Sequence, residues 1–243
     1  MSAGFLPARQ WVGERMDDPD LDRESLAGAF AGLACLNRFS CSARLIWEPL
    51  VAMARREGLA QLSVLDVATG GGDVPIALLR RARGCGIDLR VTAIDRSATA
   101  LEFAARQARR AGVPIDLRPG DAVQDPLPEG YDAVVCSLFL HHLTDAQAPA
   151  LLRAMAKSAR RLVVASDLVR SSGGYAVAWA ATRMLTRSPV VRVDGPLSVR
   201  AALTLAEART MARDAGLAGA VVRRRFPFRF VLTWMPTRHS AAS

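Results

Sequence analysis

Hydrophobic positions divide the sequence into a helical beginning and an alternating middle. From residue 25 to 58, apolar side chains recur at steps of three and four residues, which predicts two helices that break near Ser40. Further on, short apolar runs alternate with helical stretches. The expected strands are 63–69, 89–95, 115–121, 131–139 and 161–167, and the expected helices are 74–83, 97–111 and 144–159. This alternation with short connections predicts a parallel sheet covered on both faces.

The regular alternation of strands and helices ends after Asp167. Residues 171–198 hold one helix and then a stretch that is punctuated by Pro189, Gly195 and Pro196. A helix over 204–215 precedes two β-rich runs within 220–234, which meet at Pro227 and fit an antiparallel pair at the edge of the sheet. Because no internal repeat or linker interrupts the chain, one domain with an N-terminal helical extension is the simplest organisation.

Composition excludes few classes of function. A net charge of +9 on 243 residues is typical of nucleic-acid or anionic-membrane binding. However, Lys157 is the only lysine among the 32 basic residues, a skew that indicates the codon bias of a GC-rich genome. The four cysteines form no Cys-x-x-Cys pair, so we predict no metal site and expect a reducing cytosol. The N-terminus lacks a signal-peptide core, and no apolar run spans a bilayer.

The most informative segment is VLDVATGGGDVP at residues 64–75. It places a glycine cluster between a buried strand and a helix, where α/β folds bind ligands. A dinucleotide fingerprint that begins at Gly70 needs glycine at position 75, which is Pro75, and the carboxylate of Asp73 would repel a pyrophosphate at the helix N-terminus. A P-loop is excluded because no Gly-Lys-Ser/Thr follows. The turn therefore suits a nucleoside without phosphate.

Acidic residues close three successive strands. Asp95 ends the second strand, where a carboxylate can accept hydrogen bonds from both hydroxyls of a ribose. Asp121 closes the third strand and can accept from an adenine amino group, while the backbone N–H of Ala122 faces the ring. Together with Asp66 on the first strand, these carboxylates suit a ligand that carries a nucleoside and a positive charge.

At this point the sequence resembles the class I S-adenosylmethionine-dependent methyltransferases. The segment DVATGGGD at 66–73 is similar to the form of motif I found in ubiquinone and menaquinone C-methyltransferases, and CLNRFSCSARLIW at 35–47 is similar to their N-terminal segment. The likeness covers residues 25–167. It implies a Rossmann-like, doubly wound sheet of seven mostly parallel strands with an antiparallel edge strand, helices on both faces and an N-terminal helical cap. We accordingly divide the single domain, 1–243, into the cap (1–60), a cofactor-binding core (61–167), an acceptor lid (168–200) and a C-terminal helix with edge strands (201–243).

The resemblance also implies S-adenosylmethionine as cofactor and S-adenosylhomocysteine as product. Either Arg38 or Arg44 is expected to cover the bound cofactor. In place of Gly71 the relatives usually carry threonine, so we expect a more flexible loop here. The cofactor-binding residues that the resemblance implies are Arg38, Asp66, Ala68, Thr69, Gly70, Gly72, Asp95, Arg96, Asp121, Ala122, Ser137 and Leu138.

Candidate catalytic bases are few because the chain has three histidines. His239 lies in a polar tail, whereas His141 and His142 follow the fourth strand on the cofactor-binding edge. One of this pair can serve as general base for a phenol or enol acceptor. Alternatively, the pair has a structural role, in which one imidazole forms a hydrogen bond with the backbone of a loop.

Acceptor specificity is expected to lie in the lid, 168–200. Tyr175, Trp179, Met184 and Leu185 would line the site, with Arg183 or Arg192 facing an acidic or phenolic group; a helix that packs on the core explains the same residues equally well.

We therefore predict methyl transfer to a small, apolar, hydroxylated metabolite of aromatic or polyketide- and quinol-like type, with O-methylation favoured and C-methylation of a quinol-type ring as the alternative. The strings DGPLSVR (194–200) and RRRFPFR (223–229) also resemble bacterial methyltransferases linked to such metabolites. An RNA methyltransferase fits less well, because the fourth strand leads into CSLF rather than Asn/Asp-Pro-Pro-aromatic, and Cys136 lacks a preceding proline. A binding module without turnover is a third reading. We expect no nucleic-acid partner and a cytoplasmic location, and a homodimer is left open.

Overall fold

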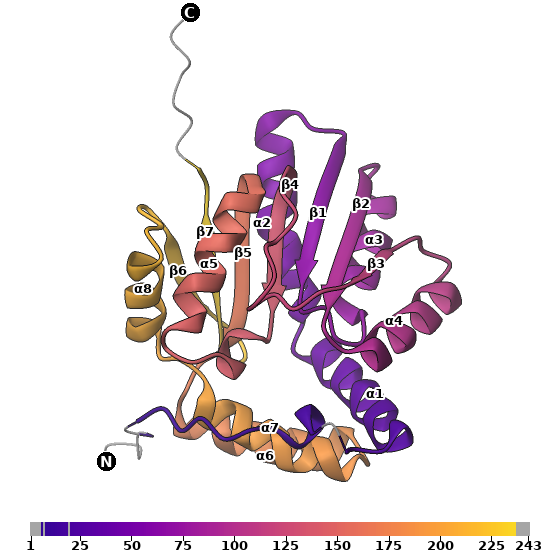
Figure 1. Ribbon diagram of the computed structural model, residues 1–243, viewed down its shortest axis with the longest axis vertical. Coiled ribbons are helices and arrows are strands. Elements are labelled where there is room, and N and C mark those ends of the chain that lie inside the picture. Colours follow the sequence, from indigo (N-terminus) through magenta and orange to yellow (C-terminus); the bar gives the residue numbers. More distant parts are fainter. Residues whose placement is uncertain (1–5, 7, 19, 237–243) are drawn as a thin grey trace, which may run out of the picture.

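The computed structural model describes residues 6, 8–18 and 20–236. Its central sheet has the strand order β3-β2-β1-β4-β5-β7-β6 (Figure 1). The strands are β1 (Gln61–Val67), β2 (Asp88–Asp95), β3 (Asp116–Pro119), β4 (Tyr131–Ser137), β5 (Ala159–Leu168), β6 (Val221–Arg225) and β7 (Arg229–Trp234). The α-helices are α1 (Arg23–Phe39), α2 (Ser42–Glu57), α3 (Asp73–Gly84), α4 (Ala98–Ala111), α5 (Gln147–Ser158), α6 (Ser172–Leu185), α7 (Pro189–Ala201) and α8 (Leu205–Asp214), and two 3-10 turns are η1 (Arg15–Asp17) and η2 (Leu140–His142).

The sheet confirms the predicted doubly wound class. Strands β1 to β5 pair in parallel, while β7 runs antiparallel to both β5 and β6. Side chains of β1 point alternately to the two faces of the sheet. Leu62 and Val64 belong to the core with α2 and α3, and Leu65 and Val67 belong to the core with α5 and α8. This alternation explains why the strand is apolar over nearly its whole length.

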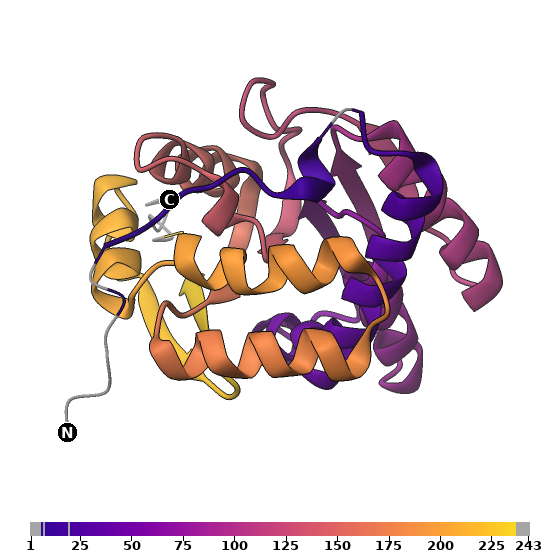
Figure 2. The ribbon, with the colours of Figure 1, turned by 90° about the horizontal axis from the view of Figure 1, so that it is seen from below.

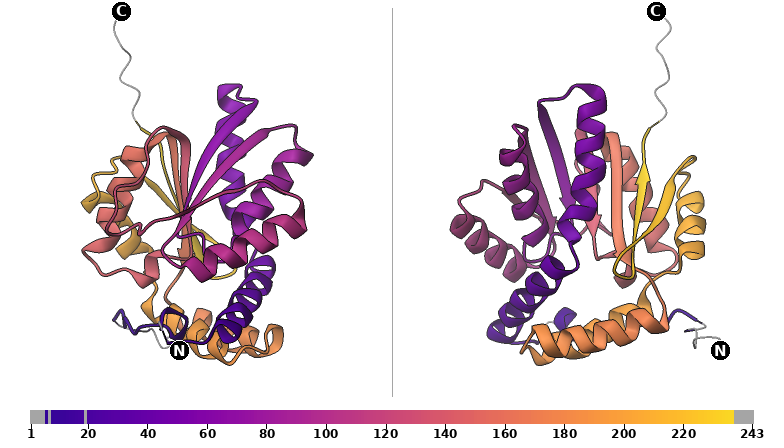
Figure 3. Two further views of the ribbon diagram at one scale, coloured as in Figure 1. Left: turned by 45° about the vertical axis from the view of Figure 1, so that its right-hand side comes forward. Right: turned by 180° about the vertical axis from the view of Figure 1, so that it is seen from behind.

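A third layer lies across the carboxyl ends of the parallel strands. Helices α6 and α7 run side by side there, and residues 8–18, which we name the N-terminal strap, follow α7 (Figure 2). Helix α1 descends from the sheet to meet this layer (Figure 3). The backbone N–H of Gln10 donates to the carbonyl of Arg200 at 3.1 Å, which ties the strap to the end of α7. Within the described residues, the helices are all too short or too polar to cross a membrane.

Residues 189–201 differ from the sequence expectation. They form helix α7, although Pro189, Gly195 and Pro196 indicate a punctuated stretch. Pro189 occupies the first turn, where its missing N–H costs nothing. Gly195 faces α6, and a Cβ placed on it would lie 2.5 Å from Cγ2 of Thr182. Here glycine permits close contact between two helices, and Pro196 lies inside the same helix.

Candidate active site

A cavity of about 810 Å³ lies between the carboxyl edge of the sheet and the layer of α6, α7 and strap. Its wall includes the ends of β1, β2 and β4, the inner faces of α1, α6 and α7, and the turn 226–228 that joins β6 to β7. The residues nominated for cofactor binding and for catalysis lie on this wall, except Arg38 and Gly72. The topology explains the convergence, because parallel strands bring their carboxyl ends to one edge.

The loop after β1 presents a buried carboxyl group to the cavity. Asp66 accepts a hydrogen bond from Oγ1 of Thr69 at 2.6 Å, and burial raises the pKa of Asp66 to about 7. Ala68 adopts a left-handed backbone conformation with φ of 55°. Such a conformation costs a residue with a Cβ about 1 kcal/mol or more, which is a feature of functional turns.

Asp95 at the end of β2 is anchored to the same loop. Its carboxylate accepts from the backbone N–H of Gly70 at 2.7 Å and from that of Ser97 at 2.9 Å. A carboxylate offers about four acceptor sites, so these bonds leave capacity for the hydroxyls of a ribose. Arg96 follows directly and also lines the cavity.

The adenine and methionine ends fit the expected cofactor as well. Asp121 accepts from the backbone N–H of Val123 at 2.8 Å and lines the cavity together with Ala122. At the end of β4, Leu138 is held at φ of 58° beside Ser137. The hydroxyl oxygen of Ser137 is buried in the cavity wall and has no hydrogen-bond partner among the described residues. An orphaned polar atom at this position fits a polar ligand group.

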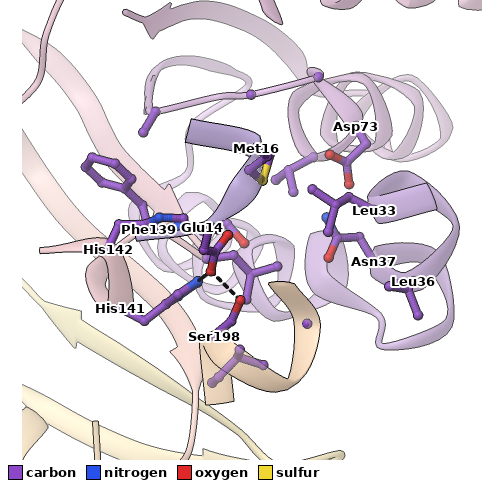
Figure 4. A pocket seen from close by; sticks show the side chains of 18 of the residues that line it. Glu14, Met16, Leu33, Leu36, Asn37, Asp73, Phe139, His141, His142 and Ser198 are labelled. Carbon is purple, nitrogen blue, oxygen red and sulfur yellow. Dashed lines mark hydrogen bonds and ion pairs between the residues drawn. The ribbon is translucent and has the colours of Figure 1, made fainter. Parts of the chain in front are cut away.

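The two arginines that were expected to cover the cofactor, Arg38 and Arg44, lie outside the cavity. The side chain of Arg38 is exposed at the end of α1, whereas its neighbour Asn37 faces the cavity near Asp73 (Figure 4). Arg44, the other basic candidate, bonds Glu48 on the surface at 2.7 Å. Helical geometry explains the correction, because adjacent residues on a helix point about 100° apart.

A structural requirement explains why residue 72 is glycine. It caps α3 with φ of +75°, and a Cβ on it would lie 2.8 Å from Cβ of Ala104. Its place in motif I therefore follows from packing between α3 and α4 and from a backbone conformation that favours glycine.

His141 is buried at the end of β4, with 4% of its side chain exposed. Its Nδ1 lies 2.7 Å from Oδ1 of Asp167, and its backbone N–H donates to Oδ2 of the same carboxylate at 3.1 Å. Its Nε2 faces Oε1 of Glu14 at 3.5 Å. Burial alone would lower the pKa of His141, but the two carboxylates outweigh it and raise that pKa to about 10.

Glu14 is the functional candidate that sequence analysis missed. Its buried carboxylate lies on the cavity wall beside His141 and His142 (Figure 4). Ser198 donates to Oε1, and Oε2 lies 3.7 Å from Nε2 of His142. Burial opposes ionisation of Glu14, but the hydrogen bond from His141 and the charge of His142 lower its pKa. A single glutamate in a polar N-terminal segment carries no sequence signal of this role.

The strap holds Glu14 in place through bonds on both sides of it. Asp194 on α7 accepts from the backbone N–H groups of Arg15 and Met16, each at 3.0 Å. Arg9 donates to the carbonyls of Leu140, His141, Leu143 and Ala201 and to the carboxylate of Asp145. The strap is therefore tied to both the histidine turn and α7.

Helix α6 lines the cavity with a different face from the one predicted. Met184 is 82% exposed, Trp179 is 49% exposed with Arg183 stacked on it, and Arg192 bonds the carbonyl of Thr186 at 3.1 Å. Tyr175 also lies outside the wall, which leaves Leu185 as the correct expectation. The α6 residues on the wall are Gly174, Val177, Ala178, Ala181, Thr182 and Leu185. These residues recur at steps of three and four along the helix, but most of them are small, and small side chains carry no sequence signal of a cavity lining. His239 lies outside the described residues.

Comparison with known proteins agrees with this geometry. The methyltransferase domain family matches residues 64–161. An uncharacterized methyltransferase of Mycobacterium tuberculosis is 32% identical over 177 residues, which cover 70% of this chain and 85% of that protein. A ubiquinone biosynthesis O-methyltransferase of Pseudomonas fluorescens is 34% identical over 92 residues, or 37% of each chain.

Solved structures share the fold. The plantazolicin methyltransferase in complex with S-adenosylhomocysteine superposes with a TM-score of 0.66 at 15% identity, covering 91% of this chain and 92% of that one. A family 2 O-methyltransferase of Planctomyces limnophilus in complex with apigenin gives 0.62 at 21% identity, covering 90% and 63%. With a relative that is 32% identical and covered over 85% of its length, and with a sheet of the expected strand order, the chain belongs to the class I S-adenosylmethionine-dependent methyltransferases.

Proposed function

We propose that this enzyme methylates a hydroxyl group of a small, largely apolar acceptor of aromatic or polyketide- and quinol-like type. The observation that carries the proposal is the composition of the cavity. Apolar side chains of α6 face one part of it, while Glu14, His141 and His142 form a polar end beside η2. A flat apolar molecule with one hydroxyl matches this division.

The cofactor end of the cavity would be formed by the strand-end acids. Asp95 would hold the ribose, Asp121 and Ala122 the adenine, and Asp66, Thr69, Gly70 and Ser137 the methionine side. Arg96, Ala68 and Leu138 would complete this wall. The bound cofactor supplies an electrophilic methyl group, so the chain must hold the acceptor in line with it and remove a proton.

The proton of the acceptor would pass to His142. Nε2 of His142 reaches the cavity beside Glu14, whose carboxylate stabilises the imidazolium that forms. His141 is a weaker candidate for base, because its pKa of about 10 keeps it protonated at neutral pH. We assign His141 a positioning role: with Asp167 behind it, it holds Glu14 in place.

Supporting evidence favours oxygen as the methylated atom. The relatives include ubiquinone biosynthesis O-methyltransferases, and the Planctomyces limnophilus protein was solved with apigenin. C-methylation of a quinol-type ring is the second candidate, since removal of a phenolic proton activates the ring carbon as well. RNA is disfavoured because the strap, α6 and α7 lie across the cavity.

The test is an acceptor screen with isotopically labelled methyl donor, using phenols, quinols and polyketide lactones. We expect labelled product, and the 13C chemical shift of the transferred methyl separates an O-methyl from a C-methyl group. Transfer to RNA alone, or no transfer to any small molecule, would overturn the proposal.

Cofactor binding is tested separately by calorimetry with S-adenosylmethionine. Asp95→Ala removes charge-assisted hydrogen bonds worth about 1.5–3 kcal/mol, so we expect affinity to fall by about tenfold or more. Asp88→Ala is the matched control, because Asp88 is an exposed aspartate at the opposite end of the same strand. Equal affinity in the two variants would remove Asp95 from the cofactor site.

A further inference from the structure

We propose that Glu14, His141 and His142 bind a divalent transition-metal ion of the Zn²⁺ class at the polar end of the cavity. One ligand atom from each of the three side chains lies within 4.8 Å of the other two. Figure 4 shows the carboxylate of Glu14 beside His141 and His142, whose rings pack with their centroids 4.3 Å apart. Two imidazoles and one carboxylate form a donor set typical of catalytic zinc sites, which keep a fourth position open for water or substrate.

The separations of the ligand atoms bring chelation within reach. Nε2 of His141 lies 3.5 Å from Oε1 of Glu14, and Nε2 of His142 lies 3.7 Å from Oε2. Ligand atoms at about 2.0–2.1 Å from one tetrahedral ion are separated by about 3.3–3.4 Å. The 3.5 Å and 3.7 Å distances end on different oxygens of Glu14, and one ligand atom from each of the three side chains lies within 4.8 Å of the others. Binding would therefore draw the ligand atoms together by up to about 1.5 Å.

A second, independent observation is the support behind the ligands. Nδ1 of His141 lies 2.7 Å from the buried carboxylate of Asp167, which directs Nε2 toward Glu14. Histidines that bind metals commonly make this bond, and the carboxylate fixes the tautomer and the orientation of the ring. Ser198 donates to Oε1 of Glu14 in the same way.

The nitrogen ligands of this site favour Zn²⁺ over Mg²⁺. Mg²⁺ favours oxygen ligands in octahedral geometry, whereas imidazole nitrogens favour Zn²⁺ and its transition-metal neighbours. Without an ion, His141 is instead paired with two carboxylates, those of Glu14 and Asp167. Binding measurements distinguish these two states directly.

The role of the ion rests on the proposed function. The open position would face the cavity and take the hydroxyl oxygen of the acceptor, whose pKa falls on metal binding. In that state the O–H bond breaks, the proton leaves to water rather than to His142, and the oxygen keeps its electron pair for attack on the methyl group. The two histidines then act as ligands rather than as bases.

The experiment is calorimetric titration of the full-length chain with Zn²⁺ and, separately, with Mg²⁺. A Cys41→Ser, Cys85→Ser background removes two exposed thiols that would bind zinc adventitiously. We expect one Zn²⁺ per chain and no comparable binding of Mg²⁺. Glu14→Gln and His142→Ala should each abolish stoichiometric binding, while His239→Ala, which removes the one remaining histidine, should leave it unchanged.

Asp167→Asn should weaken Zn²⁺ affinity about 10- to 100-fold, as expected of a carboxylate that supports a ligand. Each variant is checked for native circular dichroism, and the visible absorption of a Co²⁺-loaded sample gives a second readout of nitrogen and oxygen coordination. Loss of binding in His239→Ala, or equal binding in Glu14→Gln, would overturn the site.

The catalytic role is tested by adding a simple phenol to the Co²⁺-loaded chain. A changed spectrum supports coordination of the acceptor. An unchanged spectrum would overturn the role of the ion while leaving the site intact. Neither result depends on S-adenosylmethionine, so failure of this inference is distinguishable from failure of the proposed function.

Discussion

Nδ1 of His141, in the turn η2 that follows β4, lies 2.7 Å from Oδ1 of Asp167 near the end of β5. Both side chains are almost fully buried. Because Asp167 and Glu14 raise the pKa of His141 from 6.5 to about 10, the folded state holds a proton that the unfolded chain releases near pH 6.5. The pair therefore couples folding to pH.

The sign of this coupling leads to the first prediction. A pKa raised on folding contributes stability that is complete below pH 6.5 and is lost as pH rises toward 10. His141→Gln removes one partner of a buried pair, and we expect it to lower the free energy of unfolding by about 3 kcal/mol near pH 6. The difference from the parent chain should shrink between pH 6.5 and 10, as measured by urea denaturation.

His142→Gln is the control for this series, because His142 is next in sequence but has no contact with Asp167 among the described hydrogen bonds. A destabilisation by His141→Gln that stays constant from pH 6 to 10 would contradict the assigned protonation of His141.

Gly71 provides the second prediction. A Cβ on Gly71 would lie 3.2 Å from Phe103 and 3.4 Å from Phe30, whose rings pack with centroids 5.5 Å apart. The phenylalanine pair thus occupies the space beside Gly71. Gly71→Thr overpacks this contact, and we expect a loss of about 1–3 kcal/mol in thermal denaturation.

Phe103→Leu serves as the rescue variant, because it vacates part of the space that the threonine needs. The double variant should be more stable than the sum of the two single effects predicts. Strict additivity would show that Gly71 and Phe103 do not compete for this space.

The case of Gly71 also shows what sequence can reveal of this fold. The parallel core was predictable because period-two and helical patterns agree with the glycine turn, each being a local signal. What Gly71 faces was not predictable, since Phe30 and Phe103 come from helices distant in sequence. Gly195 was misleading for the same reason: a glycine that permits contact with Thr182 looks like a turn in a single sequence.

The candidate site divides in the same way. Strand-end residues such as Asp95 reach the cavity because sheet topology places them there, so a motif is sufficient to nominate them. Glu14 reaches it only through hydrogen bonds from the strap to α7 and η2, across more than 120 residues of sequence. No local pattern records such long-range contacts.

Arg9 provides the third prediction, because its guanidinium joins the strap to η2 and α7. Its side chain is 12% exposed and donates to four backbone carbonyls, whereas its carboxylate partner Asp145 is 91% exposed. Arg9→Ala should cost about 2–3 kcal/mol, since hydrogen bonds from charged groups are worth about 1.5–3 kcal/mol each and water replaces part of them. It should also speed hydrogen exchange of amides in residues 8–18.

Asp145→Ala removes only the exposed ion pair, so its effect should stay within about 1 kcal/mol. A strap whose exchange rates are equal in Arg9→Ala and in the parent chain would show that other contacts, such as those of Asp194, suffice to hold it.

The fourth prediction concerns the face of α6 that lines the cavity. Ala181 and Ala178 contribute small side chains to the wall, and their size leaves room for an acceptor. Ala181→Phe would fill part of that room, and we expect kcat/KM for the acceptor to fall by about tenfold or more. The Kd for S-adenosylmethionine should stay unchanged, because the strand-end acids lie on another part of the wall.

Ala176→Phe is the matched control, since Ala176 is an exposed alanine on the same helix and lies outside the cavity wall. It adds the same volume to solvent, so its kcat/KM should equal that of the parent chain. If Ala176→Phe impairs turnover as much as Ala181→Phe, the effect comes from the helix rather than from the cavity. If only Ala181→Phe impairs it, the small-residue face of α6, and not the aromatic face with Trp179, sets the size of the acceptor.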